Sequence, residues 1–322
     1  MKILLSDWHL APFRVEKFLT QKRNFIEIII QYFAKKFEDK EKEAKMLESI
    51  RLVVKKENIK VGYFNGDFME SRRTERGMNT TEDLEKALEL KAYIMKKLGL
   101  ILAFFNLGNH ESGYDLPLCT DAEKGINWQA IKNFLVFTEA EELYCSFYED
   151  NSKLIFVPYI FSEEKARDFD LDAEKKIFLG RMREDLKEDI PTILLVHDPD
   201  SFDDVELLGL IRENREKIKF IFFGHYHSWI NLFFMRIMVN VYGRILLFPF
   251  RCFVDLFFFA LTKGDVHIVR ELGIYFRKRK NIPTIIRELG AVLIPAPTGT
   301  VGIGGGYLVL DLGKGTYEKK KI

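Results

Sequence analysis

Short apolar runs alternate with longer amphipathic stretches along most of this chain. The runs have the length and composition of buried strands. Strands are predicted at Lys2–Leu5, Val61–Asn65, Ile101–Asn106, Leu154–Pro158, Thr192–Val196 and Lys219–Phe223. Between them, Asn24–Lys56, Thr81–Leu98 and Asp172–Lys187 space apolar residues three and four apart among Lys and Glu, as solvent-facing helices do. This alternation predicts an α/β protein built on a layered sheet.

Two further strands are predicted near the C-terminus, at Ala291–Pro295 and Tyr307–Leu312. The chain of 322 residues can bury a large core without disulfides, and its formal charge of +1 gives no overall field that favours nucleic acid. Three cysteines without CxxC spacing fit a reducing compartment. The first residues are too short and too soon charged for a secretion signal, so we expect a cytoplasmic protein.

Polar residues with metal-binding chemistry follow five of the predicted strands. These strand ends read Ser6-Asp7-Trp8-His9, Asn65-Gly66-Asp67, Gly108-Asn109-His110-Glu111, His197-Asp198 and Gly224-His225-Tyr226-His227. A single polar strand end is ordinary turn chemistry. In an open α/β sheet, however, the loops at the carboxyl ends of the strands converge on one edge. Five such ends together predict a ligand site there.

The residue types at these strand ends favour hard to borderline divalent ions. Carboxylates, imidazoles and an amide oxygen without thiolate suit Mn, Fe, Zn or Mg, and they are too many for one tetrahedral ion. We therefore expect two ions that share a bridging carboxylate. Two ions about 3.5–4 Å apart can hold a hydroxide and clamp the oxygens of a phosphoryl group.

In the order of these five strand ends, the chain resembles the calcineurin-like metallophosphoesterase superfamily. The blocks Asp-x-His, Gly-Asp, Gly-Asn-His-Asp/Glu, His and Gly-His-x-His of that family occur here in the same order between Asp7 and His227. The resemblance assigns residues 1–229 to the core and 290–322 to its closing strands. It implies a four-layer αββα sandwich and a phosphoesterase that cleaves a phosphomonoester, phosphodiester or diphosphate bond by attack of metal-bound hydroxide.

The resemblance also implies a role for each motif residue. Asp7, His9 and His227 would hold one ion, Asn109, His197 and His225 the other, and Asp67 would bridge them. His110 would contact the phosphate and protonate the leaving oxygen or stabilise the transition state. Manganese is the expected metal, with Fe, Zn and Mg as alternatives. Ligating imidazoles need their second nitrogen held, and Glu111 and Asp198 are candidates for that contact.

The loop after Asp67 departs from one branch of the family. It reads Phe-Met-Glu-Ser-Arg-Arg, where the protein serine/threonine phosphatases have Asp-Arg-Gly, which argues against that branch. Arg72, Arg73 and Arg76 are candidates for bidentate contacts with phosphate oxygens, and a solvated loop is the alternative. A nuclease of the same superfamily and a non-catalytic metal-binding scaffold are the alternative functions. Scaffold relatives tend to lose ligands, and no ligand is missing here.

Residues 230–289 match no part of the family pattern and are predicted to form an apolar helical insertion. Pro249 would split a helix over residues 232–261, and the three arginines and one aspartate there argue against a plain transmembrane span. Three interpretations are open. The insertion packs on its own domain or on a second subunit; or residues 230–262 form a cap on a membrane surface or acyl chain, with the basic run 277–280 facing headgroups; or it covers nucleic acid.

The nucleic-acid interpretation has the least support, because Phe and Leu outnumber basic residues in the insertion. The membrane interpretation would place the protein peripherally at a membrane and would favour a lipid-linked substrate. A nucleotide substrate is the other substrate class that we consider.

Overall fold

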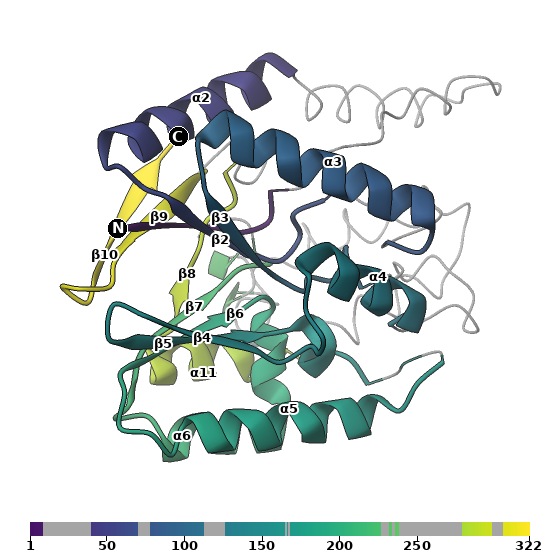
Figure 1. The fold of residues 1–322 in the computed structure, drawn as a ribbon. Coiled ribbons are helices and arrows are strands. Elements are labelled where there is room, and N and C mark those ends of the chain that lie inside the picture. The colour runs from purple at the N-terminus through teal and green to yellow at the C-terminus, as the bar shows by residue number, and fades with distance from the viewer. Residues whose placement is uncertain are drawn as a thin grey trace.

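Two five-stranded sheets face each other, with helices on their outer sides, in the computed structural model of the protein (Figure 1). The structure describes residues 1–8, 40–69, 78–112, 126–164, 166, 168–226, 232–233, 236–237, 279–297 and 305–322. The strand order is β10-β9-β1-β2-β3 in the first sheet and β4-β5-β6-β7-β8 in the second. The predicted αββα layering is confirmed.

The first sheet has a parallel centre and an antiparallel side. Its strands are β1 (Lys2–Leu5), β2 (Val61–Asn65), β3 (Leu102–Asn106), β9 (Gly306–Asp311) and β10 (Thr316–Lys321). Strands β1, β2 and β3 pair in parallel, whereas β9 runs antiparallel to both β1 and β10. The helices on its outer side are α2 (Lys40–Lys56) and α3 (Thr81–Leu98), and α4 (Trp128–Thr138) packs beside α3 (Figure 1).

The second sheet is parallel except at one edge. Its strands are β4 (Cys145–Glu149), β5 (Ser152–Val157), β6 (Thr192–Val196), β7 (Ile218–Phe223) and β8 (Val292–Leu293), of which β4 alone is antiparallel to its neighbour. Helices α5 (Leu171–Asp185), α6 (Val205–Glu213) and α11 (Ile282–Leu289) lie on its outer side (Figure 1). The short 3₁₀ helices η3 (Tyr159–Ser162) and η4 (Pro199–Asp203) follow β5 and β6.

The central strands bury both of their faces, which explains their unbroken apolar runs. In β1, Ile3 and Leu5 belong to the core beneath the helices, whereas Leu4 belongs to the layer between the sheets. The inter-sheet layer consists of Leu4, Val61, Tyr63, Leu154, Phe156, Ile193, Leu195, Phe222, Ile294, Leu308, Leu310 and Leu312. Contact between the sheets is therefore largely apolar.

Strands β4 and β10 were not predicted, because their sequences are not apolar runs. Strand β4 joins β5 through Asp150 and Asn151, whose φ angles of 49° and 62° are those of a primed hairpin turn. That Asp-Asn pair was a usable hairpin signal. Strand β10 reads Thr-Tyr-Glu-Lys-Lys-Lys and is an exposed edge, where charged residues discourage pairing with another chain. Helices α4 and α6 were also not predicted.

Most of the predicted insertion lies outside the described residues. Its last eight residues form α11, whose Ile282, Ile285 and Ile286 are buried in the same core as the sheets, and α11 packs on η4. Arg279, from the basic run 277–280, pairs with Asp200 and has only 15% of its side chain exposed. This arginine is therefore paired within the protein, and contact of the basic run with headgroups stays a prediction. No helix in the described part of the chain combines the length and the apolar character needed to cross a bilayer.

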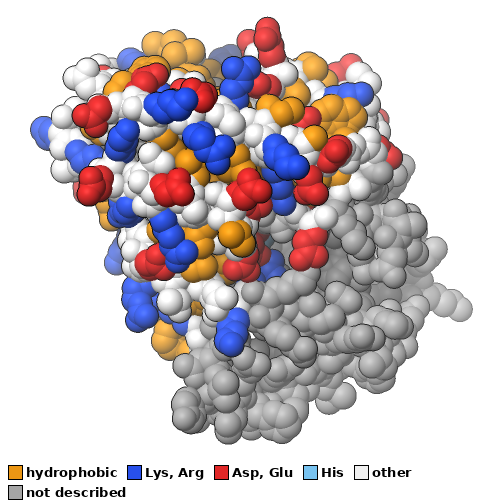
Figure 2. Space-filling model, turned by 90° about the horizontal axis from the view of Figure 1, so that it is seen from below, with side chains coloured by type: hydrophobic (Ala, Val, Ile, Leu, Met, Phe, Trp, Pro, Cys, Tyr) orange, Lys and Arg blue, Asp and Glu red, His pale blue; other side chains and the backbone are white. Residues whose placement is uncertain are grey.

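The face of the molecule on the side of α5 and α6 carries charges of both signs. Figure 2, which views the molecule from below Figure 1, shows acidic and basic side chains interspersed with apolar ones over its described part. The described part of this face thus presents no field of a single sign, in agreement with the balanced composition.

Candidate metal centre

Five predicted metal ligands lie on the edge where the parallel strands of both sheets end. The first sheet supplies Asp7 after β1, Asp67 after β2 and Asn109 after β3, and the second supplies His197 after β6 and His225 after β7. The carboxyl ends of these strands meet because both sheets carry their parallel strands in the same direction (Figure 1). The site consequently spans the two sheets.

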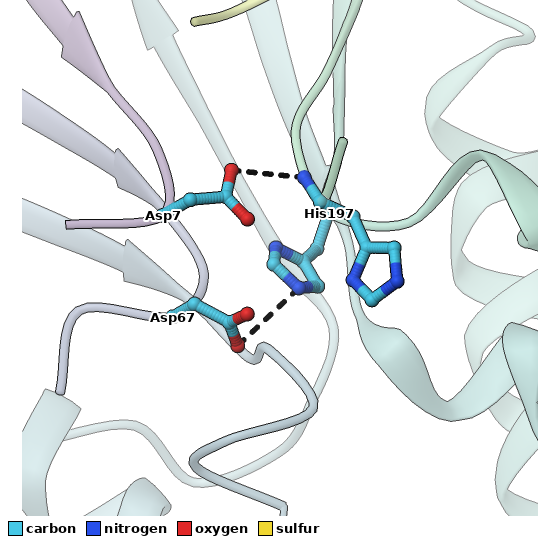
Figure 3. Close-up of side chains that lie close together, drawn as sticks. Asp7, Asp67 and His197 are labelled. Carbon is cyan, nitrogen blue, oxygen red and sulfur yellow. Dashed lines mark hydrogen bonds and ion pairs between the residues drawn. The ribbon is translucent and has the colours of Figure 1, made fainter. Parts of the chain in front are cut away.

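Four of these side chains form one compact cluster of possible ligand atoms. Asp7, Asp67, His197 and His225 each offer one atom, and these atoms lie within 4.8 Å of one another. Figure 3 shows the carboxylates of Asp7 and Asp67 directed from the first sheet toward the imidazole of His197. Asp7 and His197 are fully buried and Asp67 nearly so. Buried carboxylates and imidazoles this close together provide the donor set of a divalent ion.

Three of these residues have backbone angles in the left-handed region. The φ angles of Asp7, Asp67 and His225 are 52°, 49° and 65°. Residues other than glycine rarely occupy this region. Hydrogen bonds hold them there: the His225 amide donates to Asp7 Oδ2 over 2.8 Å, and the His110 amide donates to Asp67 Oδ1 over 2.9 Å. Backbone strain of this kind gathers at functional sites.

A glycine precedes His225 because the loop after β7 passes against the loop after β1. A Cβ at Gly224 would lie 2.0 Å from Ser6 Oγ and 2.6 Å from Asp7 Oδ2. Only glycine allows this approach, which brings the His225 amide into hydrogen-bond distance of Asp7. The close approach that Gly224 permits therefore connects His225 of the second sheet to Asp7 of the first.

His197 is oriented by the backbone of the opposite sheet. Its Nδ1 lies 2.8 Å from the Asn65 carbonyl oxygen, so that Nδ1 carries a proton and Nε2 faces Asp67 Oδ1 at 3.4 Å. Burial lowers the pKa of His197, but the negative charge of Asp67 and then that of Asp7 outweigh it and raise the pKa to about 10. The two carboxylates therefore favour a positive charge at the position of His197 Nε2. A divalent ion would displace the Nε2 proton and take over that charge.

Asn109 lies against the cluster. Its side-chain amide is 3.2 Å from His197 Nε2 and 2.9 Å from Asp67 Oδ2. An amide can offer its oxygen to a cation, and amide oxygen, carboxylate and imidazole together are donors that suit a divalent ion. The buried donors therefore fit a divalent ion.

The three remaining motif side chains near the cluster have distinct positions. His110 Nε2 lies 3.9 Å from Asp67 Oδ2, with 13% of the His110 side chain exposed. Asp198 Oδ2 lies 3.8 Å from His225 Nε2, while Asp198 Oδ1 caps η4 by accepting from the Asp200 amide. Among the described residues, Glu111 hydrogen-bonds no imidazole and accepts from backbone amides.

A family model described as calcineurin-like phosphoesterase matches residues 3–229 of the chain. The chain belongs to this family. It is accordingly a metal-dependent phosphoesterase, a hydrolase of phosphate esters. Among solved structures, the chain is similar to a dimetal phosphatase from Danio rerio, with 12% identity, a TM-score of 0.39, and coverage of 70% of this chain and 81% of that one. A search of curated proteins gave no significant match.

Other predicted site residues of this phosphoesterase lie outside the described residues. These are the ligands His9 and His227 and the arginines Arg72, Arg73 and Arg76. Their roles stay predictions. In contrast, three polar residues at the metal edge were not predicted to act there: Ser6, Asn65 and Asn106. The usable signal was an asparagine that closes each of two apolar runs, at a position where a buried strand normally has an apolar residue.

Glu111 connects the loop of Asp67 to the loop of Asn109. Its Oε2 accepts from the amides of Asp67 (2.9 Å) and Gly108 (3.0 Å), and its Oε1 accepts from the Met69 amide (3.1 Å). Burial and then the charge of Asp67 raise the pKa of Glu111 above its usual value, while the hydrogen bonds from the amides favour the charged form. Glu111 is therefore a positioning residue for two predicted ligands.

Replacement of Glu111 by alanine is expected to lower the free energy of unfolding by about 3 kcal/mol or more, because three buried N–H groups lose their acceptor. Urea denaturation of the chelator-treated protein measures this. Glu111→Gln keeps one acceptor oxygen and should lose less stability than Glu111→Ala. Equal stability of Glu111→Ala and the wild type would show that the two loops do not depend on this carboxylate.

Proposed function

We propose that the protein is a dinuclear-metal phosphoesterase whose ions lie between the two sheets. The proposed ligands are Asp7, His9, Asp67, Asn109, His197, His225 and His227. The observation that supports this most directly is the approach of Asp7, Asp67, His197 and His225 within 4.8 Å at the carboxyl ends of four strands. Two such ions would supply a water nucleophile at neutral pH and neutralise charge on the phosphoryl oxygens.

The protein residues have separate tasks in this proposal. Asp67 would serve both ions through one carboxylate, which lies 3.4 Å from His197 Nε2. His197 presents Nε2 because its Nδ1 is held by Asn65. His110 is held by its own amide on Asp67, with its ring beside the cluster and partly open to solvent. That position suits a group that gives a proton to the leaving oxygen of a bound phosphate ester.

The substrate and the physiological metal are finer proposals. We propose manganese, since the donor set of carboxylate, imidazole and amide oxygen suits it, with Fe, Zn or Mg as alternatives. Because 232–261 is rich in Phe and Leu, lipid-linked phosphate esters should be compared with nucleotide and sugar-diphosphate esters. Contact of 230–262 with a membrane surface or with a second subunit would show as liposome binding or as a dimer that is lost when 232–261 is deleted.

Removal of the metal tests the proposed function. Chelator-treated protein should not hydrolyse bis(4-nitrophenyl) phosphate or 4-nitrophenyl phosphate, and Mn²⁺ should restore hydrolysis of at least one of them together with uptake of two ions per chain, measured by elemental analysis. Full activity of a protein shown to be metal-free would overturn the proposal, as would failure to take up Mn²⁺.

Replacement of His110 by alanine should separate catalysis from metal binding. We expect kcat to fall by about 10²-fold or more, because a positioned general acid contributes that much, while the protein still binds two ions. Elemental analysis and steady-state kinetics on the same preparation measure both quantities. A loss of one ion in His110→Ala would instead make His110 a ligand.

A further inference from the structure

The predicted ligands come from two sheets whose contact is largely apolar, apart from Glu149 of β4, which bonds Lys2 and Tyr63 of the first sheet far from the ligands. The first sheet supplies the carboxylates and Asn109, and the second supplies the imidazoles His197 and His225. Apolar contact is not directional. Metal ligands must be held to a fraction of an ångström. Hydrogen bonds between the sheets near the metal edge would supply direction where the ligands need it.

Two buried asparagines make such a contact. Asn106 Nδ2 lies 2.9 Å from Asn65 Oδ1, 2.9 Å from the Val157 carbonyl oxygen and 3.0 Å from the Leu195 carbonyl oxygen. Asn65 Nδ2 donates to the Val196 carbonyl oxygen over 2.8 Å. Asn65 is fully buried and Asn106 is 3% exposed. The pair thus links β2 and β3 of the first sheet to β5 and β6 of the second.

The position of the two asparagines in the sheet explains how they reach across. Asn65 and Asn106 are direct partners in the parallel pairing of β2 with β3, and they form the last row before the metal edge. Asn65 follows Tyr63 at a spacing of two, so both face the layer between the sheets. Along this face Val61 and Tyr63 precede Asn65, and the Tyr63 hydroxyl bonds Glu149 of the second sheet, so the row of two asparagines is the polar contact nearest the metal edge on β2 and β3.

The same pair contacts the ligand residues directly. Asn65 is separated from Asp67 only by Gly66, and its side chain holds Val196, the residue before His197. Its backbone carbonyl oxygen accepts from Ser6 Oγ over 2.9 Å and contacts His197 Nδ1 at 2.8 Å. Asn65 therefore fixes both the backbone and the ring of His197 relative to the carboxylates of the first sheet.

We infer that Asn65 and Asn106 form an inter-sheet amide clasp that sets the distance between the carboxylate and imidazole ligands, and that this clasp determines metal affinity. The inference rests on the ligands proposed above. Both residues are positioning residues, because their amides bond the frame of the ligands and not the ions.

The test compares metal binding by clasp variants with that of a control variant in the same inter-sheet layer, with the stability of each protein measured. Asn106→Leu removes all three of the donor contacts, and Asn106→Ser leaves a shorter hydroxyl. Leu310→Ala is the matched control: Leu310 is 2% exposed in the same inter-sheet layer but pairs with Lys2, at the end of β1 away from Asp7. Equilibrium dialysis with Mn²⁺ gives the Kd and the number of ions for each protein, and urea denaturation gives the stability.

We expect the Kd for Mn²⁺ to rise about 10- to 100-fold in the Asn106 variants, the range typical of residues that orient metal ligands, and to stay within about twofold in Leu310→Ala. If neither Asn106 variant folds, Asn65→Ser, which leaves the bonds of Asn106 to the second sheet in place, is measured with the same expected rise. Clasp variants that bind two ions as tightly as the control would overturn the inference. A wild-type protein that takes up no Mn²⁺ would instead overturn the proposed function.

Discussion

Asp67→Asn is expected to reduce phosphate ester hydrolysis by about 10³-fold or more while the metal-free protein stays folded. The loss follows because Asp67 is the proposed bridge between two ions that together contribute several kcal/mol to stabilising the transition state. The fold should persist because Asn keeps an oxygen that accepts from the His110 amide, over the 2.9 Å that separates it from Asp67 Oδ1. It also removes one of the buried negative charges of the cluster.

Kinetics with Mn²⁺, elemental analysis and urea denaturation measure the three parts of this result. Asp311→Asn is the control, because it removes the same charge where β9 pairs with the beginning of β1, at the end away from the metal edge. It should leave kcat and ion content unchanged. If Asp67→Asn retained two ions and full activity, Asp67 would not be the bridge.

The same substitution should change how the stability of the metal-free protein depends on pH. In the wild type, the folded pKa of His197 is raised to about 10, chiefly by Asp67 against the effect of burial. A raised histidine pKa stabilises the folded state below the unfolded value of about 6.5, and this stabilisation is lost as pH rises from there through about 10. We expect the free energy of unfolding to fall over this window in the wild type and to fall less in Asp67→Asn.

Gly66→Ala is expected to destabilise the protein by about 2–5 kcal/mol and to abolish uptake of the second ion. Gly66 has φ +80°, where an L side chain adds about 1–2 kcal/mol of strain. Its Cβ would also lie 2.2 Å from Nδ1 and 2.5 Å from Cγ of His197, and such overpacking adds about 1–3 kcal/mol. The imidazole must move away from the Asn65 carbonyl oxygen that orients it.

A second glycine with a positive φ angle allows the backbone strain to be measured without the steric clash. Gly99, at the end of α3, has φ +75°, but a Cβ there would meet nothing within 4 Å. Gly99→Ala should therefore show only the strain and leave Mn²⁺ binding unchanged. Urea denaturation and equilibrium dialysis of both variants measure the difference. Equal effects of the two substitutions would show that His197 does not depend on the absence of a Cβ at Gly66.

The sequence predicted the fold and the approach of four polar residues correctly where a residue pattern has one dominant physical cause. The run Thr192–Val196 is unbroken because β6 is buried on both faces, so its apolar pattern located it to the residue. The polar motif residues that follow β1, β2, β6 and β7 were expected at one edge, and Asp7, Asp67, His197 and His225 do meet there. Strand β10 was missed because an exposed edge strand buries little, and its charged sequence carries no apolar pattern.

The sequence by itself determined which strands are buried, which polar residues end them and which chemistry those residues share, because burial and turn formation depend on residues close in the chain. Only the tertiary structure decided that His197 is oriented by Asn65, that Glu111 bonds three backbone amides, and that Asn65 and Asn106 join the two sheets. These contacts connect residues up to 132 positions apart. No local pattern encodes such pairs, because they arise when two separately predictable sheets pack face to face.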